Sequence, residues 1–438
     1  MKSIVISSNC SGGGKTTISI GLMKVLKNRG YDVQGYKVGP DYIDTAFHTR
    51  ITGKASRNLD LFLTGEAGMK ACYSRGTGDF GIVEGAMGLY DGIGIDTEGS
   101  AAHIARTLNL PVLLVLSPTA QVATLCAEIN GLMAFENVNI IGVVLNNISE
   151  SYFKLLKATI ELNCNIKVLG YLPKDKSLNL SSRHLGLIQS QEIDDLEDRI
   201  EHCSKLMEQY INIDAILEEM KEVPEFEDNF HYKNIGLRSA VPYDKAFSFY
   251  YKENLEALAE LGEVVYFSPL KDAKLPENID FLYIGGGYPE IYAKELSENT
   301  SMLTSIKQAL NNGLNCYAEC GGLMYLTDAI EKHKMVGFFN GNTTLTKSLQ
   351  NFGYCQIEIE NQEGHFPKNL KINCHEFHTS FVELSEAKQY SITKTQYNGE
   401  ILKWEDGYFK NNTLAGYPHV HFFGNMEFLK QIIGVKYR

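Results

Sequence analysis

The sequence lacks the features that mark membrane-spanning, exported and nucleic-acid-binding proteins. Its longest apolar run, LPVLLVL (110–116), is too short to span a bilayer, and the start, MKSIVISSNC, has no apolar core of the kind that a secretory signal carries. The formal net charge is −12, whereas nucleic-acid binding needs a clustered basic surface. None of the 9 cysteines forms a C-x-x-C pair. We therefore expect a cytoplasmic protein with reduced thiols and with no nucleic acid or membrane among its partners.

The chain is too long for one hydrophobic core. Its 438 residues, 44% hydrophobic and 21% charged, are typical of a globular protein with two domains. A stretch with one proline, several acids and no periodicity separates two patterned halves. We place the first domain at 1–223, a linker at 224–233 and the second domain at 234–438.

Both halves alternate short apolar runs with helical segments, which predicts two α/β domains. The runs of the first half are too uniformly apolar to have one wet face, so they favour a doubly wound parallel sheet covered on both sides. In the second half, helices are expected around 249–261 and 300–312. The expected strands are 3–7, 33–38, 80–84, 112–116, 140–145 and 167–172 in the first half, and the strand segments of the second half are 234–240, 263–267, 280–290 and 314–320.

A phosphate-binding loop is expected where SIVISSNCSGGGKTT (3–17) joins a strand to a helix. In a P-loop, glycines let backbone N–H groups approach the phosphates, the lysine reaches the β/γ-phosphates and the following hydroxyl binds Mg²⁺. One departure is Asn9, which stands where the motif has its first glycine. A glycine-rich turn without a ligand is the alternative. The residues that fit the motif are Gly12, Gly13, Gly14, Lys15 and Thr16, followed by Thr17.

Carboxylates follow two of the expected strands. Glu84 ends the strand 80–84, where this fold places a Mg²⁺ ligand, and Asp91 lies seven residues on in a glycine-rich loop. Asp41 and Asp44 follow the strand 33–38 and would share one face of a helix that starts at Pro40. Acids in a phosphate site are metal ligands or general bases. Turn chemistry for Asp91 and favourable helix N-terminal charge for Asp41 and Asp44 are the alternatives.

Cys320 lies in YAECGGLMYL (317–326), at an expected sharp turn from a strand to a helix. A residue at such a turn is exposed, and a helix N-terminus lowers the pKa of a thiol, so the pattern predicts a nucleophile. Gly286 and Gly287 offer backbone donors for an oxyanion, and His419 or His421 offers a base. A buried thiol is the alternative, and Cys316 in the strand is interpreted as core.

On these motifs the chain resembles the cobyrinate a,c-diamide synthase family over nearly its full length. The first half resembles dethiobiotin synthetase in fold, and the second resembles class I glutamine amidotransferases. The motifs that carry the resemblance are SSNCSGGGKTT, YKVGPDYIDTAFH, VEGAMGLYDG, SSRHLGL, PYDKAFSFYY, GGGYPE, YAECGGLMYL, HEFHTS and YPHVHF.

The resemblance implies a ligase that uses ATP, Mg²⁺ and glutamine to amidate two acetate side chains of a corrinoid through an acyl phosphate. It allows a homodimer. It implies that Cys320 and His419 hydrolyse glutamine with Gly286, Gly287 and Gly321 nearby, that Asp44 and Asp91 are catalytic acids, and that Thr16 and Glu84 hold the metal. The remaining implied sites are Asn146 near the adenine, and Asp41, Tyr42 and Ile43 beside the substrate. Because that substrate is a polycarboxylate and the chain is acidic, we expect local cations in its pocket, with Lys37, Arg57, Arg183 and His184 as candidates. A solvated loop is the alternative for Arg183 and His184.

Two departures accompany the resemblance. His421 stands where ordinary class I amidotransferases have a glutamate, which leaves open what orients His419. Ala318 replaces the glycine expected two residues before the nucleophile. His375 and His378 lack the H-E-x-x-H spacing of a metal site, so we expect a structural or domain-interface role for them and no metal.

Other functions remain open at this point. Hydrogenobyrinate and nickel-sirohydrochlorin are alternative substrates, because enzymes that act on them share these motifs. A P-loop switch ATPase is the alternative from another class, although the chain has neither the extra lysine early in the loop nor a basic tail.

Overall fold

The computed structural model describes residues 1–178, 196–359 and 370–434. The chain divides into two compact units, the first formed by 1–61 and 69–228 and the second by 62–68 and 229–438. Arg183 and His184 lie outside the described residues. Among the residues described, no helix combines the length and the apolar character needed to cross a membrane.

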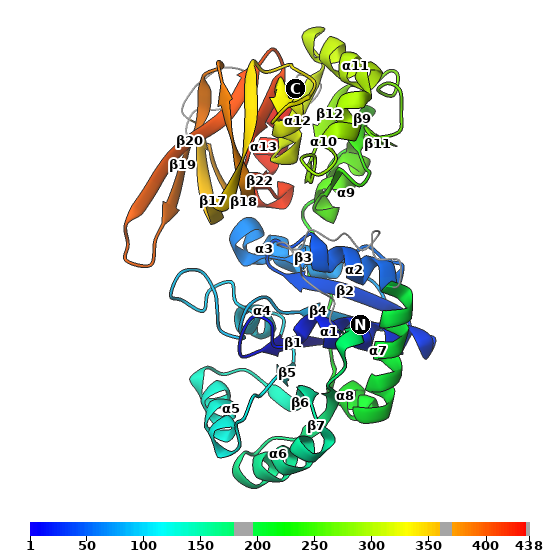
Figure 1. The fold of residues 1–438 in the computed structure, drawn as a ribbon, viewed down its shortest axis with the longest axis vertical. Coiled ribbons are helices and arrows are strands. Elements are labelled where there is room, and N and C mark those ends of the chain that lie inside the picture. Colours follow the sequence, from blue (N-terminus) through cyan, green and yellow to red (C-terminus); the bar gives the residue numbers. More distant parts are fainter. Residues whose placement is uncertain (179–195, 360–369, 435–438) are drawn as a thin grey trace. The chain divides into compact units, whose positions relative to one another are not determined.

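The first unit is built on a parallel sheet whose strands follow the order β3-β2-β4-β1-β5-β6-β7 (Figure 1). The short β8 (Lys221–Glu222) pairs antiparallel with β1. All six runs that the sequence predicts are strands, which confirms the doubly wound pattern, and β3 is an additional one. Their bounds are β1 Lys2–Ser8, β2 Val33–Val38, β3 Arg57–Leu59, β4 Phe80–Glu84, β5 Val112–Leu116, β6 Ile140–Ile148 and β7 Val168–Pro173.

Helices cover both faces of this sheet. One apolar core joins the sheet to α1, α7 and α8, and a second joins β5, β6 and β7 to α5 and α6. Apolar side chains on both faces explain why the strands read as continuous Val/Ile/Leu runs. The helices are α1 Lys15–Asn28, α2 Ile43–Thr52, α3 Leu61–Ser74, α4 Ala101–Thr107, α5 Ala123–Phe135, α6 Glu150–Asn163, α7 Leu196–Tyr210 and α8 Ile213–Glu219.

The second unit begins as the expected α/β fold. Four parallel strands, in the order β11-β9-β12-β14, are followed by β21, which is parallel to β14. Cys316 of β14 is 1% exposed, so its interpretation as core is confirmed. The elements of this part are β9 Leu237–Pro242, β10 Phe247–Phe249, α9 Lys252–Leu261, β11 Gly262–Phe267, β12 Phe281–Ile284, β13 Gly286–Gly287, α10 Ala293–Glu298, α11 Thr300–Asn311, β14 Asn315–Glu319, α12 Gly321–Leu326 and β21 Thr413–Gly416.

A long antiparallel extension continues this sheet, and the sequence did not predict it. β17 and β18 pair along most of their length, and β19 and β20 form a further hairpin. Its strands carry many polar residues and have half-exposed faces, so they lack the apolar runs that reveal buried parallel strands. The elements are β15 Ala329–Ile330, β16 His333–Lys334, β17 Gly341–Ile359, β18 Lys371–Leu384, β19 Lys388–Thr395, β20 Ile401–Lys410, β22 His419–Val420 and α13 Met426–Ile432.

Candidate active sites

The P-loop connects β1 to α1 with little room for any residue but glycine. Gly14 caps α1 at φ 98°, a left-handed conformation that favours glycine. A methyl group on Gly13 would lie 1.9 Å from Ser8 Oγ. Gly12 is exposed at φ +77°, and Thr17 is half-buried on α1. The backbone is therefore fixed in a tight turn directly before the helix N-terminus, where a phosphate group would find N–H donors.

Lys15 folds over this loop. Its Nζ donates to the carbonyl oxygens of Cys10 (2.9 Å) and Met87 (2.5 Å). Burial lowers the pKa of the Lys15 amine, and the positive charge of Lys37 adds to that effect. A lysine held by two carbonyls can move onto a phosphate, because the anion is a stronger partner than either carbonyl.

Glu84 is the centre of a buried ionic cluster at the end of β4. It lies beside Lys37 in the register of β4 with β2, and Lys37 Nζ is 2.9 Å from Glu84 Oε1 and 2.5 Å from Asp44 Oδ2. His48 Nε2 lies 2.8 Å from Glu84 Oε2, and Thr16 Oγ1 donates to Oε1 at 2.6 Å. The structure therefore brings four predicted residues together and adds His48, which the sequence interpretation missed.

The charges of this cluster depend on one another. Burial acts to raise the pKa of Glu84, but Lys37 and His48 outweigh it and hold that pKa well below its usual range. Burial raises the pKa of Asp44, and the charge of Glu84 adds to the rise. Burial acts to lower the pKa of Lys37, but Asp44 and Glu84 outweigh it and raise that pKa.

Two predicted substrate contacts need correction. Lys37 is 4% exposed and is held by two carboxylates, so it does not form a wall that a macrocycle could reach. Arg57 is 7% exposed and donates to the carbonyl of Arg75 at 3.1 Å. Both cations are used inside the first unit, because a buried charge needs a partner.

Thr16 and Glu84 fit the donor set that Mg²⁺ prefers. Their side-chain oxygens are 2.6 Å apart at the start of α1, beside the phosphate loop. Mg²⁺ takes hard oxygen ligands, usually one or two from protein and the rest from water and phosphate. These two residues could hold the ion next to a bound nucleotide.

The segment after β2 differs from its prediction at the helix start. The helix α2 begins at Ile43, not at Pro40, and Asp41 Oδ1 accepts the N–H groups of Ile43 (2.8 Å) and Asp44 (2.9 Å). Asp41 therefore closes the turn before the helix, while Asp44 points to Lys37. Tyr42, Ile43 and Asp41 are all half-buried.

Asn146 lies against the P-loop, whereas Asp91 lies in the loop that follows β4. Asp91 is exposed, and its Oδ2 accepts the N–H of Gly88 at 2.8 Å, which is turn chemistry. Asn146 Nδ2 donates to Ser117 Oγ at 2.9 Å, and a methyl group on Gly14 would meet Asn146 Nδ2 at 2.2 Å. The end of β6 thus supports the loop.

Cys320 occupies a strained turn between β14 and α12. Its φ is 50°, which is unfavourable for a residue with a side chain, and its N–H donates to the carbonyl of Gly416 at 2.8 Å. A methyl group on Gly321 would lie 2.9 Å from Pro289 Cδ and 3.1 Å from the nitrogen of Gly287. The predicted elbow is present, and the GGGYPE loop lies directly against it.

The prediction of an exposed thiol with a lowered pKa is wrong. Cys320 is 5% exposed. Burial raises the pKa of its thiol, the nearby carboxyl of Glu290 adds to the rise, and the N–H of Gly321 offsets only part of it. Because α12 is only six residues long, its N-terminus cannot overcome the loss of solvent. A thiolate would therefore have to form by proton transfer to a nearby base.

His419 lies in β22 beside the same glycine loop. A methyl group on Gly286 would lie 2.5 Å from His419 Cε1 and 3.4 Å from Nε2. On the other side of the ring, His419 Nδ1 is 3.8 Å from Glu319 Oε2. The glycine loop of the second unit therefore lies between the two predicted catalytic residues: Gly287 lies against Gly321, the neighbour of Cys320, and Gly286 lies against His419.

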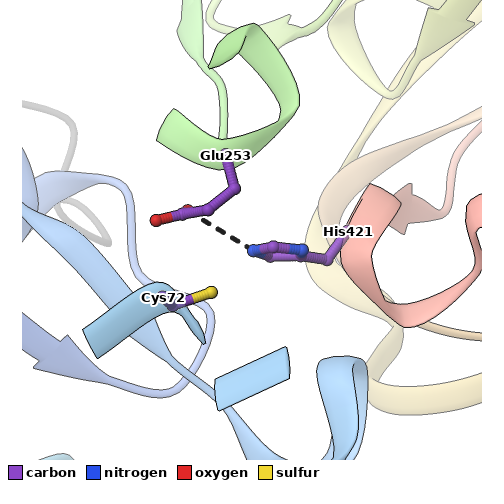
Figure 2. A group of neighbouring side chains, drawn as sticks. All are labelled: Cys72, Glu253 and His421. Atoms are coloured by element: carbon purple, nitrogen blue, oxygen red, sulfur yellow. Dashed lines mark ion pairs between the residues drawn. The ribbon is translucent and has the colours of Figure 1, made fainter. Parts of the chain in front are cut away.

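Three other histidines of this unit have structural partners. His378 Nε2 is 2.9 Å from Glu376 Oε2, and its ring stacks on Tyr417 at 3.8 Å. His375 packs against the His419 ring at 4.9 Å, and burial holds the pKa of His375 well below its usual range. His421 Nε2 is 3.5 Å from Glu253 Oε2 (Figure 2), and Cys72, also drawn there, belongs to the first unit.

The sequence interpretation missed Glu319 and His48. Glu319 directly precedes Cys320, and the nucleophile elbow motif specifies small residues around the thiol but no acid at this position. His48 ends the quoted motif YKVGPDYIDTAFH, where its helical spacing of four from Asp44 was an available signal.

Comparisons with known proteins match both units. Residues 4–188 match the family described as CobQ/CobB/MinD/ParA nucleotide binding domain, and 238–427 match the family described as CobB/CobQ-like glutamine amidotransferase domain. Cobyrinate a,c-diamide synthase of Clostridium tetani is 63% identical over 437 residues, which are 99% of this chain and 100% of that protein. The protein of that name from Clostridium acetobutylicum is 58% identical over 436 residues, 99% and 100% of the two chains. The chain belongs to the cobyrinate a,c-diamide synthase family.

Proposed function

We propose that this chain amidates the a- and c-acetate carboxylates of cobyrinate with ammonia from glutamine, at the expense of ATP. The observation that carries the proposal is the presence of two different sites in one chain. One is a phosphate loop with a hydroxyl and a carboxylate side by side. The other is a thiol on a strand-to-helix turn, packed against a glycine loop that also contacts a histidine. Full-length relatives named for this reaction support it.

The first site would make a carboxylate reactive. A carboxylate is a poor electrophile, since its oxygen is a bad leaving group. A substrate carboxylate oxygen attacks the γ-phosphorus of ATP, the bond to the bridging oxygen breaks and ADP leaves, which gives an acyl phosphate. Ammonia then attacks the acyl carbon, and inorganic phosphate leaves as the amide forms. Lys15 and the N–H groups of Gly12, Gly13 and Gly14 would hold the phosphates. Mg²⁺, held by Thr16 and Glu84, would neutralise phosphate charge.

The second site would release ammonia. Cys320 Sγ attacks the amide carbon of glutamine while His419 takes the thiol proton, and the N–H groups near Gly286, Gly287 and Gly321 would stabilise the oxyanion. His419 returns the proton to the leaving ammonia. Water then cleaves the thioester to give glutamate. The raised pKa of Cys320 is compatible with this route, because the thiolate need form only when a base is in place.

Further roles extend this proposal to the substrate site. Asp44 and Asp91 would act as acids in the activation step, with Asp41, Tyr42 and Ile43 beside the macrocycle. Arg183 and His184 would offer cations to its carboxylates, and Asn146 would lie near the adenine.

Mass spectrometry of the product tests the proposal directly. Purified protein with cobyrinate, ATP, Mg²⁺ and glutamine should convert two carboxyl groups to amides, with stoichiometric ADP and glutamate. Cobyrinate left unchanged would contradict the proposal. A panel that includes hydrogenobyrinate and nickel-sirohydrochlorin identifies the preferred macrocycle. Amide formation on only one of these two would show that this compound, and not cobyrinate, is the substrate.

A further inference from the structure

The glutaminase site raises the question of what orients its base. A histidine that accepts a proton through Nε2 works best when a carboxylate holds its Nδ1–H, because this fixes the tautomer and the ring orientation. Position 421 cannot supply that carboxylate, since it is a histidine. Its Nδ1 accepts the N–H of Phe423 at 3.3 Å, and its Nε2 faces Glu253.

We propose that Glu319, the residue directly before the nucleophile, is the positioning residue for His419. Glu319 Oε2 lies 3.8 Å from His419 Nδ1. This inference rests on the proposed glutaminase function of Cys320 and His419. In it, His419 Nδ1–H is directed to Glu319, and Nε2 remains unprotonated to take the thiol proton.

The surroundings of Glu319 fix its position. The carboxylate is 1% exposed in β14. Oε1 accepts the N–H of Val420, the neighbour of His419, at 2.9 Å, and Oε2 accepts the hydroxyl of Tyr283 at 3.0 Å. Each carboxylate oxygen therefore accepts one hydrogen bond. Because one donor is the backbone N–H of the residue next to His419, the position of the carboxylate is fixed relative to the histidine.

The ring orientation of His419 agrees with this role. The edge that carries Cε1 and Nε2 faces Gly286 of the loop next to the nucleophile, whereas Nδ1 faces Glu319. The His375 ring packs against the imidazole at 4.9 Å. The distance of 3.8 Å is longer than a hydrogen bond, as catalytic contacts in sites without substrate commonly are. We infer that it shortens when glutamine fills the site.

The arrangement also explains how two consecutive residues, the acid Glu319 and the nucleophile Cys320, can both act on His419. Alternate residues of a strand point to opposite faces, but Cys320 leaves the strand at φ 50°. Its thiol and the Glu319 carboxylate can therefore serve the same imidazole from one short segment. The acid comes from the strand that carries the nucleophile, and the position two residues after the base is free to be a histidine.

The decisive variant is Glu319→Gln, which keeps the shape of the side chain and removes its charge. Glutaminase kcat is expected to fall by roughly a hundredfold or more, as for the loss of an orienting acid, with KM for glutamine changed by less than about twofold. Alkylation of Cys320 by iodoacetamide should slow in this variant to nearly the rate of His419→Ala. Glu319→Asp, which restores a carboxylate, should recover part of kcat.

Two controls separate positioning from folding. Tyr283→Phe removes one donor to Glu319 and keeps the charge, so kcat should fall by less than about threefold. Ammonia-dependent amide formation by Glu319→Gln should match that of the unsubstituted protein, since it uses the first unit. If Glu319→Gln does not fold, Glu319→Asp tests the role by reach, because its shorter side chain draws the carboxylate away from His419 Nδ1. Its kcat should then lie below that of Tyr283→Phe, and equal kcat in the two variants would overturn the inference.

Three outcomes overturn the inference. The first is a kcat of Glu319→Gln within about threefold of normal. The second is a fall in its kcat/KM that comes from a higher KM instead of a lower kcat. The third is a kcat of Glu319→Asp no higher than that of Glu319→Gln. Failure of the proposed function looks different, because glutaminase activity would then survive Cys320→Ala and His419→Ala as well. If those two variants are inactive and Glu319→Gln is normal, only the positioning role is wrong.

Discussion

Individual buried charges decide the chemistry of both sites. Glu84 has no exposed surface and is held by Lys37, His48 and Thr16. Cys320 is buried as well, but its neighbours include the acidic Glu290, so burial and charge act together to raise its pKa. The first environment favours an ionised group and the second a neutral one. An ionised carboxylate suits the proposed metal ligand Glu84. A neutral thiol suits a nucleophile, Cys320, that loses its proton only to a neighbouring base.

Substitution of Lys37 by methionine should destabilise the first unit. Glu84 and Asp44 would lose their shared cation while they stay buried, and breaking such a pair costs about 3–5 kcal/mol. Chemical unfolding followed with a probe in the first unit measures this. Lys154→Met, which removes an exposed pair with Glu150, should leave the free energy of unfolding nearly unchanged. Equal losses in the two variants would show that the buried cluster carries no special stability.

Glu290 should make the second unit less stable as the pH rises. Burial raises its pKa to about 7, whereas the unfolded chain ionises it near its ordinary value, so the folded state binds more protons between those pH values and loses stability across that window. Glu290→Gln should therefore be more stable than the unsubstituted protein at pH 8, by about 1–3 kcal/mol.

The same comparison at pH 5 supplies the control. There the gain from Glu290→Gln should be much smaller, because the carboxyl is mostly neutral in the folded state. Glu295→Gln, at an exposed position of α10, should show no such pH-dependent difference. A gain from Glu290→Gln that is the same at both pH values would contradict the argument.

Both candidate sites lie at the carboxyl ends of strands. β1 leads to the phosphate loop, β4 ends in Glu84, β12 leads to the GGGYPE loop and β14 ends next to Cys320. These junctions are short, and glycines permit backbone approaches that a methyl group would prevent. The sites are therefore properties of strand ends and of the turns that follow them.

Gly286→Ala should impair the glutaminase and leave the first unit active. The new methyl group would lie 2.5 Å from His419 Cε1, so the base must move. Glutaminase kcat/KM should fall at least tenfold, while ammonia-dependent amide formation is unchanged. Gly131→Ala on α5 is the control, because a methyl group there would have no atom within 4 Å. This variant should leave both rates unaltered. Normal glutaminase activity in Gly286→Ala would mean that the base is not at this loop.

The sequence could predict elements whose pattern is local. The apolar strands and the phosphate loop are found where they were expected, because buried parallel strands and glycine turns have strong signatures. The antiparallel extension from β17 to β20 was not predicted, since its polar strands depend on pairing with distant residues. The start of α2 was misplaced, because Asp41 closes a turn ahead of the helix. The environment of Cys320 and the contact of Glu319 with His419 depend on packing that no single segment records.

Each of the two units carries residues that we assign to one half of the proposed reaction. The first unit carries Lys15, Thr16 and Glu84, and the second carries Cys320 and His419. We therefore expect that substitutions can separate glutamine hydrolysis from ATP-dependent amide formation. Removal of one should leave the other measurable.

The most direct measurement is amide formation by Cys320→Ser with glutamine or with ammonium as the nitrogen source, quantified by mass spectrometry. Glutamine-dependent product should vanish, and ammonium-dependent product should form at the rate of the unsubstituted protein. Lys15→Ala should show the reverse pattern, with glutaminase activity and no amide from either source. If Cys320→Ser loses both activities while still folded, or keeps its use of glutamine, the division of chemistry between the two units is contradicted.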